Sequence, residues 1–270
     1  MGNFVFENKN GIIIGKSDDV QLNAGLRYGF STRTGGVSEG SLSSLNLGIN
    51  RPDSIENLQE NYGIFCSAIG INPKDTVLAK QVHSDIITEI DASQTRGRLD
   101  KKEPMTDCDG LITQDNRVAI GIFYADCTPI LLFDVKKKIL CAVHCGWRGT
   151  VKGFAAKGIF EMTKKYNTSV ENIHVVIGPC IDKCCFEVGD EVAQEFKRAG
   201  MEQFIYSGKI PEKFYVDLKG TNREFLLNAG VRAENITVAA DCTCCNTDKY
   251  FSHRGCGADT GRMAVVAQIK

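Results

Sequence analysis

Two histidines and a cysteine, His83, Cys127 and His144, are the residues whose types could form a metal centre. Two imidazoles and a thiolate fill three of zinc's four tetrahedral positions and leave one open, which is typical of a working site. The separations are 44 and 17 residues, far from any short zinc-finger spacing, so the fold must assemble the set. From residue types alone, hydrogen-bonded core histidines and an inert packed thiol remain the alternative.

The neighbours of these residues add to the chemistry. Asp126 precedes Cys127 and could orient a ligand or move a proton. His144 and Cys145 are followed by Gly-Trp-Arg-Gly, a loop whose glycines allow close approach to a ligand. A different chemistry is also open, in which Cys127 is the nucleophile of a hydrolase and His144 its base.

The elements that must position these residues can be predicted from the apolar runs. Three β-branched runs bounded by turn residues predict a β-meander with strands at 118–123, 130–133 and 139–143. In an antiparallel meander Cys127, in the first connection, and His144, at the end of the third strand, fall at one sheet edge. We expect His83 to follow a strand around 75–79.

The rest of the chain mixes helices and strands without strict alternation. Capping and periodicity predict helices at 150–166, 192–198 and 217–228, and strands at 173–177, 236–240 and 263–269. This order favours an α+β fold with mixed sheets over a doubly wound one. The polar segment Thr95–Met105 reads as an exposed loop rather than a domain boundary, so we expect a single domain over residues 1–270.

Composition limits the function classes. The 270 residues carry a net charge of −1, and the Lys136–Lys138 run reads as a solvated turn, so no nucleic-acid partner is expected. No apolar stretch is long enough to span a membrane, and the N-terminus does not resemble a signal peptide. We expect a cytoplasmic protein that is a monomer or a weak homo-oligomer.

The chain has twelve cysteines, most of which we interpret as small buried apolar residues. The Cys242-x-x-Cys245 spacing could bind zinc or cycle a disulfide. A second such pair would make a structural zinc site the better interpretation, but Cys180, Cys184 and Cys185 do not supply that spacing. Packing is therefore favoured over a second metal site or a redox pair.

Two further segments could contact a ligand. Arg33 beside Gly35 and Gly36 suits an anion such as phosphate, because guanidinium offers a fork of donors and glycine frees backbone N–H groups. A glycine turn with a surface arginine is an equal alternative. His253 lies in a polar loop and could contact substrate or solvent, whereas His174, inside an apolar strand, favours a structural role. Nucleotide-binding signatures are absent from the sequence.

Ordered blocks along the chain resemble one family, the laccase-domain family, long labelled polyphenol oxidases and now described as purine nucleoside phosphorylases, with a human macrophage member. The blocks include Thr32–Ser38 (TRTGGVS), Ser44–Gly48 (SLNLG), Gln81–His83 (QVH), Asp109–Thr113 (DGLIT), Ala125–Pro129 (ADCTP), His144–Thr150 (HCGWRGT) and Phe251–Arg254 (FSHR).

The resemblance implies a single domain of α/β/β/α layers in which His83, Cys127 and His144 bind a catalytic zinc. It implies phosphorolysis of adenosine, inosine, guanosine and methylthioadenosine, and deamination of adenosine. Copper-dependent phenol oxidation is the alternative, because one thiolate and two imidazoles suit copper as well as zinc. Cys108, Cys145 and Cys180 stand where the family often has alanine, and the Cys145 thiol could compete as a ligand.

The two expected reactions ask for different groups. Deamination needs an activated water at C6 of adenine and a carboxylate that carries a proton to ammonia, for which Asp126 is our first candidate and Glu187 our second. Phosphorolysis needs phosphate held at the ribose C1′ while the purine leaves, with Arg33 and Arg148 as candidate clamps. The expected substrate-binding and phosphate-binding residues are Arg33, Asn46, Arg148 and His253.

Overall fold

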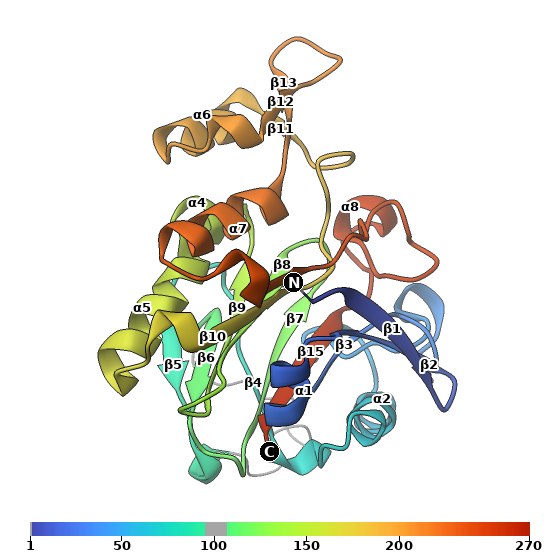
Figure 1. Cartoon of the computed structure of the whole chain (residues 1–270). Coiled ribbons are helices and arrows are strands. Elements are labelled where there is room, and N and C mark those ends of the chain that lie inside the picture. The colour runs from blue at the N-terminus through green and yellow to red at the C-terminus, as the bar shows by residue number, and fades with distance from the viewer. Residues whose placement is uncertain (1, 95–106) are drawn as a thin grey trace.

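Two six-stranded sheets face each other, and helices cover their outer faces (Figure 1). The computed structural model describes residues 2–94 and 107–270, so the loop expected at Thr95–Met105 lies outside the described residues. A large apolar core lies between the sheets, with Phe30 and Ile122 from one sheet and Phe133 from the other. The layered α/β/β/α architecture expected from the sequence is confirmed.

The first sheet is mostly antiparallel. Its strand order is β1 (Phe4–Lys9), β2 (Ile12–Ser17), β3 (Leu26–Ser31), β15 (Met263–Ile269), β7 (Ala119–Tyr124) and β4 (Thr76–Leu78). Helix α2 (Ile55–Ala68) packs on the outer face through the fully buried Tyr62 and Phe65. The pair β4–β7 is parallel, so both strands end at the same edge of the sheet.

The second sheet carries the other half of the core. Its order is β14 (Ile236–Val238), β10 (Ile173–Ile177), β8 (Thr128–Asp134), β9 (Ile139–Cys145), β6 (Gly110–Thr113) and β5 (Ile87–Glu89). Helices α5 (Phe154–Tyr166) and α7 (Leu218–Asn228) cover its outer face, and α4 (Trp147–Val151) follows β9. Every residue of β8 and β9 is buried, as expected for central strands with both faces covered.

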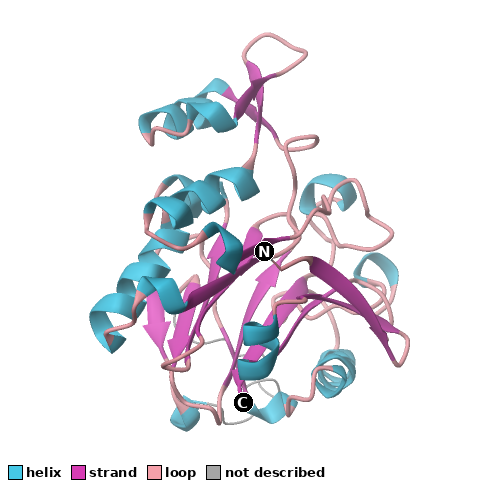
Figure 2. Ribbon diagram, viewed as in Figure 1, coloured by secondary structure: helices cyan, strands magenta, loops and turns pink. Residues whose placement is uncertain are grey.

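A small third sheet stands at one end of the molecule beside α6 (Asp190–Arg198) (Figure 2). Its strands are β11 (Glu187–Gly189), β13 (Lys213–Val216) and β12 (Ile205–Ser207). Two short helices complete the described elements, α1 (Val20–Gly25) and α8 (His253–Cys256). No helix in the described ranges is long and apolar enough to cross a membrane.

The predicted meander is wrong in its first strand. Strands β8 and β9 pair antiparallel, but β7 belongs to the other sheet, and the chain crosses between the sheets at Ala125–Cys127. Strand β7 is buried on both faces, so its sequence lacks the alternation that would reveal its neighbours. The crossing is tight, with Asp126 at φ 88°, a region that non-glycine residues rarely adopt.

The other predicted elements are close to the observed ones. The strands at 173–177 and 263–269 are confirmed, and the strand at 236–240 ends at Val238. The helix predicted at 150–166 is two helices, because Gly153 at φ 66° interrupts it. The Asp217 side chain caps α7 by accepting a hydrogen bond from the Gly220 amide at 2.7 Å.

Candidate metal centre and its pocket

Two neighbouring crossings between the sheets and the end of one strand bring the three candidate ligands together. After β4 the chain passes to β5, and after β7 it passes to β8; His83 lies on the first crossing and Cys127 on the second. Because β4 and β7 are parallel neighbours, the two crossings start side by side. His144 lies near the end of β9, where it pairs with Pro129, two residues beyond Cys127.

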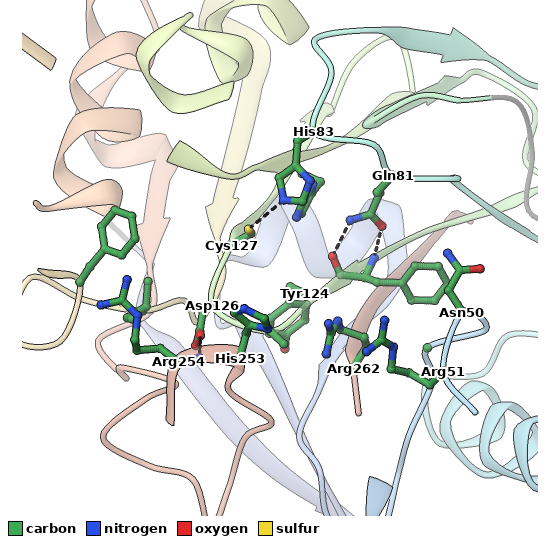
Figure 3. Close-up of a pocket in the computed structure, with 16 residues that line it drawn as sticks. Asn50, Arg51, Gln81, His83, Tyr124, Asp126, Cys127, His253, Arg254 and Arg262 are labelled. Atoms are coloured by element: carbon green, nitrogen blue, oxygen red, sulfur yellow. Dashed lines mark hydrogen bonds between the residues drawn. The ribbon is translucent and has the colours of Figure 1, made fainter. Parts of the chain in front are cut away.

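The ligand atoms of the three side chains all lie within 4.8 Å of one another. His83 Nε2 is 3.8 Å from Cys127 Sγ, and the two imidazole rings meet edge to face with centroids 5.2 Å apart (Figure 3). Tetrahedral zinc would hold a sulfur and a nitrogen ligand about 3.6 Å apart, given its usual bond lengths. The spacing therefore fits one metal ion.

Asp109 orders this set, and our sequence reasoning missed its role. Its fully buried carboxylate accepts a hydrogen bond from His144 Nδ1 at 2.8 Å, which turns the Nε2 atom of that ring toward Cys127. The same carboxylate accepts the backbone amides of Val82, His83 and Ser84 at 2.6 to 3.1 Å. One carboxylate thus orients both histidines, and this holds His83 at φ 60°.

The electrostatics favour a thiolate at Cys127. Burial alone raises the pKa of its thiol, but the charge of His144 and hydrogen bonds from His144 and His83 outweigh burial, so the pKa lies at about 6. For His144, burial lowers the pKa, while Cys127 and Asp109 raise it to about 9. Both shifts favour a thiolate–imidazolium pair in the metal-free site, and a bound cation would replace the imidazolium proton.

The two residues that follow His144, Cys145 and Gly146, are both compatible with a metal ion at this site, although neither would be a ligand. A Cβ added at Gly146 would lie 2.9 Å from the His83 ring and 3.2 Å from Cys127 Sγ, so only glycine leaves room beside the ligands. Cys145, which the sequence left open as a competing ligand, is fully buried in the core against α5. Burial raises the pKa of its thiol well above the usual value, which keeps it neutral.

The ligand set opens into a pocket of about 400 Å³, within the range of small-molecule sites. Three arginines that the sequence analysis missed line it: Arg51, Arg254 and Arg262 (Figure 3). Burial and the neighbouring Arg51 charge lower the pKa of Arg262 to about 10. Arg51 Nε is buried and has no hydrogen-bond partner among the described residues. Neither arginine forms an ion pair in the described part of the chain, so the two guanidiniums present positive charge to the pocket.

Four predicted site residues do not line the pocket. Arg33 donates to the Ser43 and Thr247 carbonyls and stacks on Phe251, so it joins loops. Asn46 is fully buried and donates to the Asp53 carboxylate.

The other two, Arg148 and Glu187, also lie outside the pocket lining. Arg148 stacks on the ring of Trp147 with 4.3 Å to the centroid. Glu187 accepts a hydrogen bond from the Tyr215 hydroxyl at 3.1 Å. The sequence could not separate these residues from the pocket arginines, because each is a polar residue in or beside a loop.

Asp126 and His253 do line the pocket. The Asp126 carboxylate accepts hydrogen bonds from the hydroxyls of Thr243 and Ser252 and from the Arg254 amide, all at 2.6 to 2.7 Å. It therefore fastens the loop that carries His253 and Arg254 to the crossing beside Cys127. His253 is exposed at the pocket rim.

Gln81 is another pocket residue that the sequence analysis did not single out. Its side-chain amide pairs with both backbone groups of Phe123, at 2.6 and 2.8 Å, as a neighbouring strand would (Figure 3). The Gln81 side chain thus extends the pairing of β4 with β7 beyond the end of β4. This contact fixes the point from which the segment that carries His83 crosses to the second sheet. A glutamine two residues before a candidate ligand was the available signal.

Comparisons with known proteins agree on one family. Residues 27–270 match the family described as "Multi-copper polyphenol oxidoreductase laccase". A purine nucleoside phosphorylase of Bacteroides thetaiotaomicron is 33% identical, over 86% of this chain and 87% of its own length. "Adenosine deaminase RL5", from an unknown prokaryotic organism, is also 33% identical, over 86% and 90%. The crystal structure of YlmD from Geobacillus stearothermophilus superposes with a TM-score of 0.91 at 28% identity and covers 99% of both chains.

Proposed function

The chain belongs to the multi-copper polyphenol oxidoreductase laccase family, and on that premise we propose that it is a zinc-dependent purine nucleoside phosphorylase that also deaminates adenosine. The carrying observation is that the ligand atoms of His83, Cys127 and His144 converge, with both histidines oriented by one buried carboxylate, in a pocket that two half-buried arginines also line. Adenosine, inosine, guanosine and methylthioadenosine are the proposed substrates. The cytoplasmic location and the monomeric or weakly associated state remain predictions.

The donor set supports a metal with an open position. Cys127 supplies a thiolate at neutral pH, and Asp109 fixes the His144 tautomer that leaves Nε2 for the ion. When bound, zinc would supply a Lewis acid and lower the pKa of a water molecule toward neutrality. Phe123 and Phe186 offer apolar surface in the same pocket for the purine.

We assign phosphate binding to Arg51 and Arg262 in place of Arg33 and Arg148. The first two lie in the pocket with no ion-pair partner in the described part of the chain, and the last two lie outside it. A phosphate dianion there would accept charge-assisted hydrogen bonds and offset the repulsion between the guanidiniums. Arg262 is itself held by two hydrogen bonds to the carbonyls of Thr260 and Gly261, which fix its position.

We assign proton transfer in deamination to a residue that lines the pocket. Asp126 is committed to three hydrogen bonds, so we propose that it positions His253 and Arg254 rather than carrying a proton in every cycle. His253, at the rim, is then the group free to give a proton to leaving ammonia. Glu187 lies outside the pocket lining and keeps no direct role in this scheme.

The test is turnover of adenosine with phosphate by the pure protein, followed by chromatography of the products. We expect adenine, ribose-1-phosphate and some inosine. Cys127→Ala should lose both activities by at least about 1,000-fold, because the ligand set is broken. Cys256→Ser, which alters an exposed cysteine outside the pocket lining, is the matched control and should behave as wild type. Equal rates for Cys127→Ala and wild type would reject the proposal.

Two alternative activities can be tested with the same protein preparation. A cysteine hydrolase is favoured by the thiolate–imidazolium pair, and it would survive a chelator but not a thiol-alkylating reagent. A phenol oxidase would consume oxygen at a rate that follows copper content and not zinc content. The proposed enzyme loses activity with the chelator, regains it with zinc and consumes no oxygen.

A further inference from the structure

Four cysteines outside the pocket lining converge in a second cluster. Cys184 and Cys185 come from the turn between β10 and β11, and Cys242 and Cys245 from the turn after β14. Their four sulfur atoms all lie within 4.8 Å of one another. Cys245 Sγ is 3.4 Å from the sulfur of Cys184 and 3.3 Å from that of Cys185.

The backbone brings the two turns together. Cys180 and Cys242 form a parallel bridge, and the Thr243 amide donates to the Cys180 carbonyl at 3.1 Å. The first turn closes through the Cys185 amide, which donates to the Asp182 carbonyl at 2.9 Å. Main-chain hydrogen bonds thus hold the backbones of the two turns that carry the four sulfurs.

Packing does not explain this cluster. Cys242 is buried and Cys185 half-buried, but Cys184 and Cys245 are exposed to solvent, where an apolar side chain gains nothing from the core. A single disulfide is also a poor explanation, because Cys245 lies almost equally close to two sulfurs and two of the four thiols would remain. Tetrahedral zinc with four thiolates would hold each pair of sulfurs about 3.8 Å apart, between the short contacts and the outer limit observed here.

Three polar groups beside the cluster could stabilise a bound metal centre. The Asp182 amide donates to Cys242 Sγ at 3.3 Å, a hydrogen bond that favours negative sulfur. The buried Lys219 ammonium donates to the Asp182 carboxylate and to the carbonyl of Asp241, the residue before Cys242. The guanidinium of Arg254 donates to the Cys185 carbonyl at 3.3 Å. Two cations therefore lie beside a cluster that would carry net negative charge with zinc bound.

We propose that Cys184, Cys185, Cys242 and Cys245 bind one zinc ion as four thiolates, with release of the thiol protons to solvent. Four protein ligands close the coordination sphere, so the site is structural. It ties two segments that both reach the pocket. Ile181 and Phe186 flank the first turn, and Arg254 follows the second. Zinc here would brace one wall of the first site without taking part in its chemistry.

The experiment counts zinc per chain by elemental analysis after purification with zinc under reducing conditions. We expect two in wild type, one in Cys127→Ala and one in the double variant C242S/C245S. Cys256→Ser should retain two, because that exposed cysteine is outside the cluster. The proposal is overturned if C242S/C245S retains the wild-type count, or if Cys127→Ala holds none. Failure of the proposed function would appear separately, as turnover by Cys127→Ala.

A second measurement uses wild-type protein and so does not depend on the variants folding. Cys245 is exposed, so in metal-free protein its thiol is open to alkylation. Zinc should slow its alkylation at least about 10-fold and leave exposed Cys256 unchanged, as read by peptide mass spectrometry. Equal rates with and without zinc, or a cluster disulfide in the zinc-treated protein, would overturn the proposal.

Discussion

The two sulfur-containing clusters of this chain differ in every feature that distinguishes working from structural metal sites. The first has one thiolate and two imidazoles, a buried carboxylate behind them and a pocket in front. The second has four thiols, one backbone amide that donates to the Cys242 sulfur, and no residue in that pocket's lining. Three ligands leave room for substrate, whereas four leave none.

The number of metal ligands must therefore be interpreted together with the groups that orient those ligands. The buried Asp109 carboxylate orients both His83 and His144. A metal ion that only crosslinks the chain would not need ligands oriented in this way. The four cysteines are positioned by turns alone, because thiolates need no choice of tautomer. Three measurements test this contrast between the two clusters.

The largest effect should follow from Asp109→Asn, which keeps the shape and removes the charge. Burial raises the pKa of this carboxyl, but the hydrogen bond and charge of His144 lower it to about 2, so it is ionised at neutral pH. We expect zinc affinity at the first site to fall about 10- to 100-fold, measured by competition with a chromophoric chelator. Zinc at the four-cysteine cluster should be retained.

The control for this change is Asp115→Asn. Its carboxylate pairs with Arg117 at the surface and contacts neither cluster, so both zinc affinities should stay as in wild type. Equal weakening of both sites by Asp109→Asn would mean that the variant loosens the whole fold, and the comparison would fail.

A smaller effect should separate phosphate from metal. Arg262→Gln removes a guanidinium from the pocket, so the KM for phosphate should rise about 10- to 30-fold, as expected for one charged hydrogen bond. Deamination, which uses no phosphate, should change less than about 3-fold. Arg148→Gln is matched in chemistry but lies outside the pocket lining and should change neither rate. Equal losses in both reactions would show that Arg262 supports the fold and not phosphate.

The smallest effect concerns thiol reactivity in metal-free protein as a function of pH. The rate of Cys127 alkylation should rise through a midpoint at about pH 6 and then level off, because only the thiolate reacts. Partial burial and the contact with Cys245 raise the pKa of Cys184, so that residue should stay slow at neutral pH. Peptide mass spectrometry across the pH range reads both. A Cys127 midpoint near the ordinary value of about 8.5 would remove the proposed ion pair with His144.

Much of the fold could be predicted because local signals and burial agree. The strands at 173–177 and 263–269 have apolar runs bounded by turn residues, and Asp217 caps α7. The partners of β7 could not be predicted. Its six residues are buried on both faces, and which sheet it joins is decided by contacts with β4 and β15, far away in sequence.

The candidate site also has residues that could be predicted from the sequence and residues that could not. Residue type made His83, Cys127 and His144 candidates, the family resemblance favoured them as a set, and the fold brings their ligand atoms within 4.8 Å of one another. Type could not separate Arg262 from Arg33, because burial and the direction of a side chain depend on the whole fold. The cluster around Cys245 was missed because a spacing rule searches for two ligands on each of two short loops, and adjacent cysteines do not match the usual interval.

The crossings between β4 and β5 and between β7 and β8 have a consequence for how the protein matures. Because His83 and Cys127 each lie where the chain leaves one sheet for the other, the three ligands cannot meet until the two sheets have docked. The nascent chain would therefore offer no such site, and a metal ion would bind there only after the sheets have docked. Once bound it stabilises the docked sheets over any half-assembled form by mass action, so metal supply and the yield of folded protein should rise together.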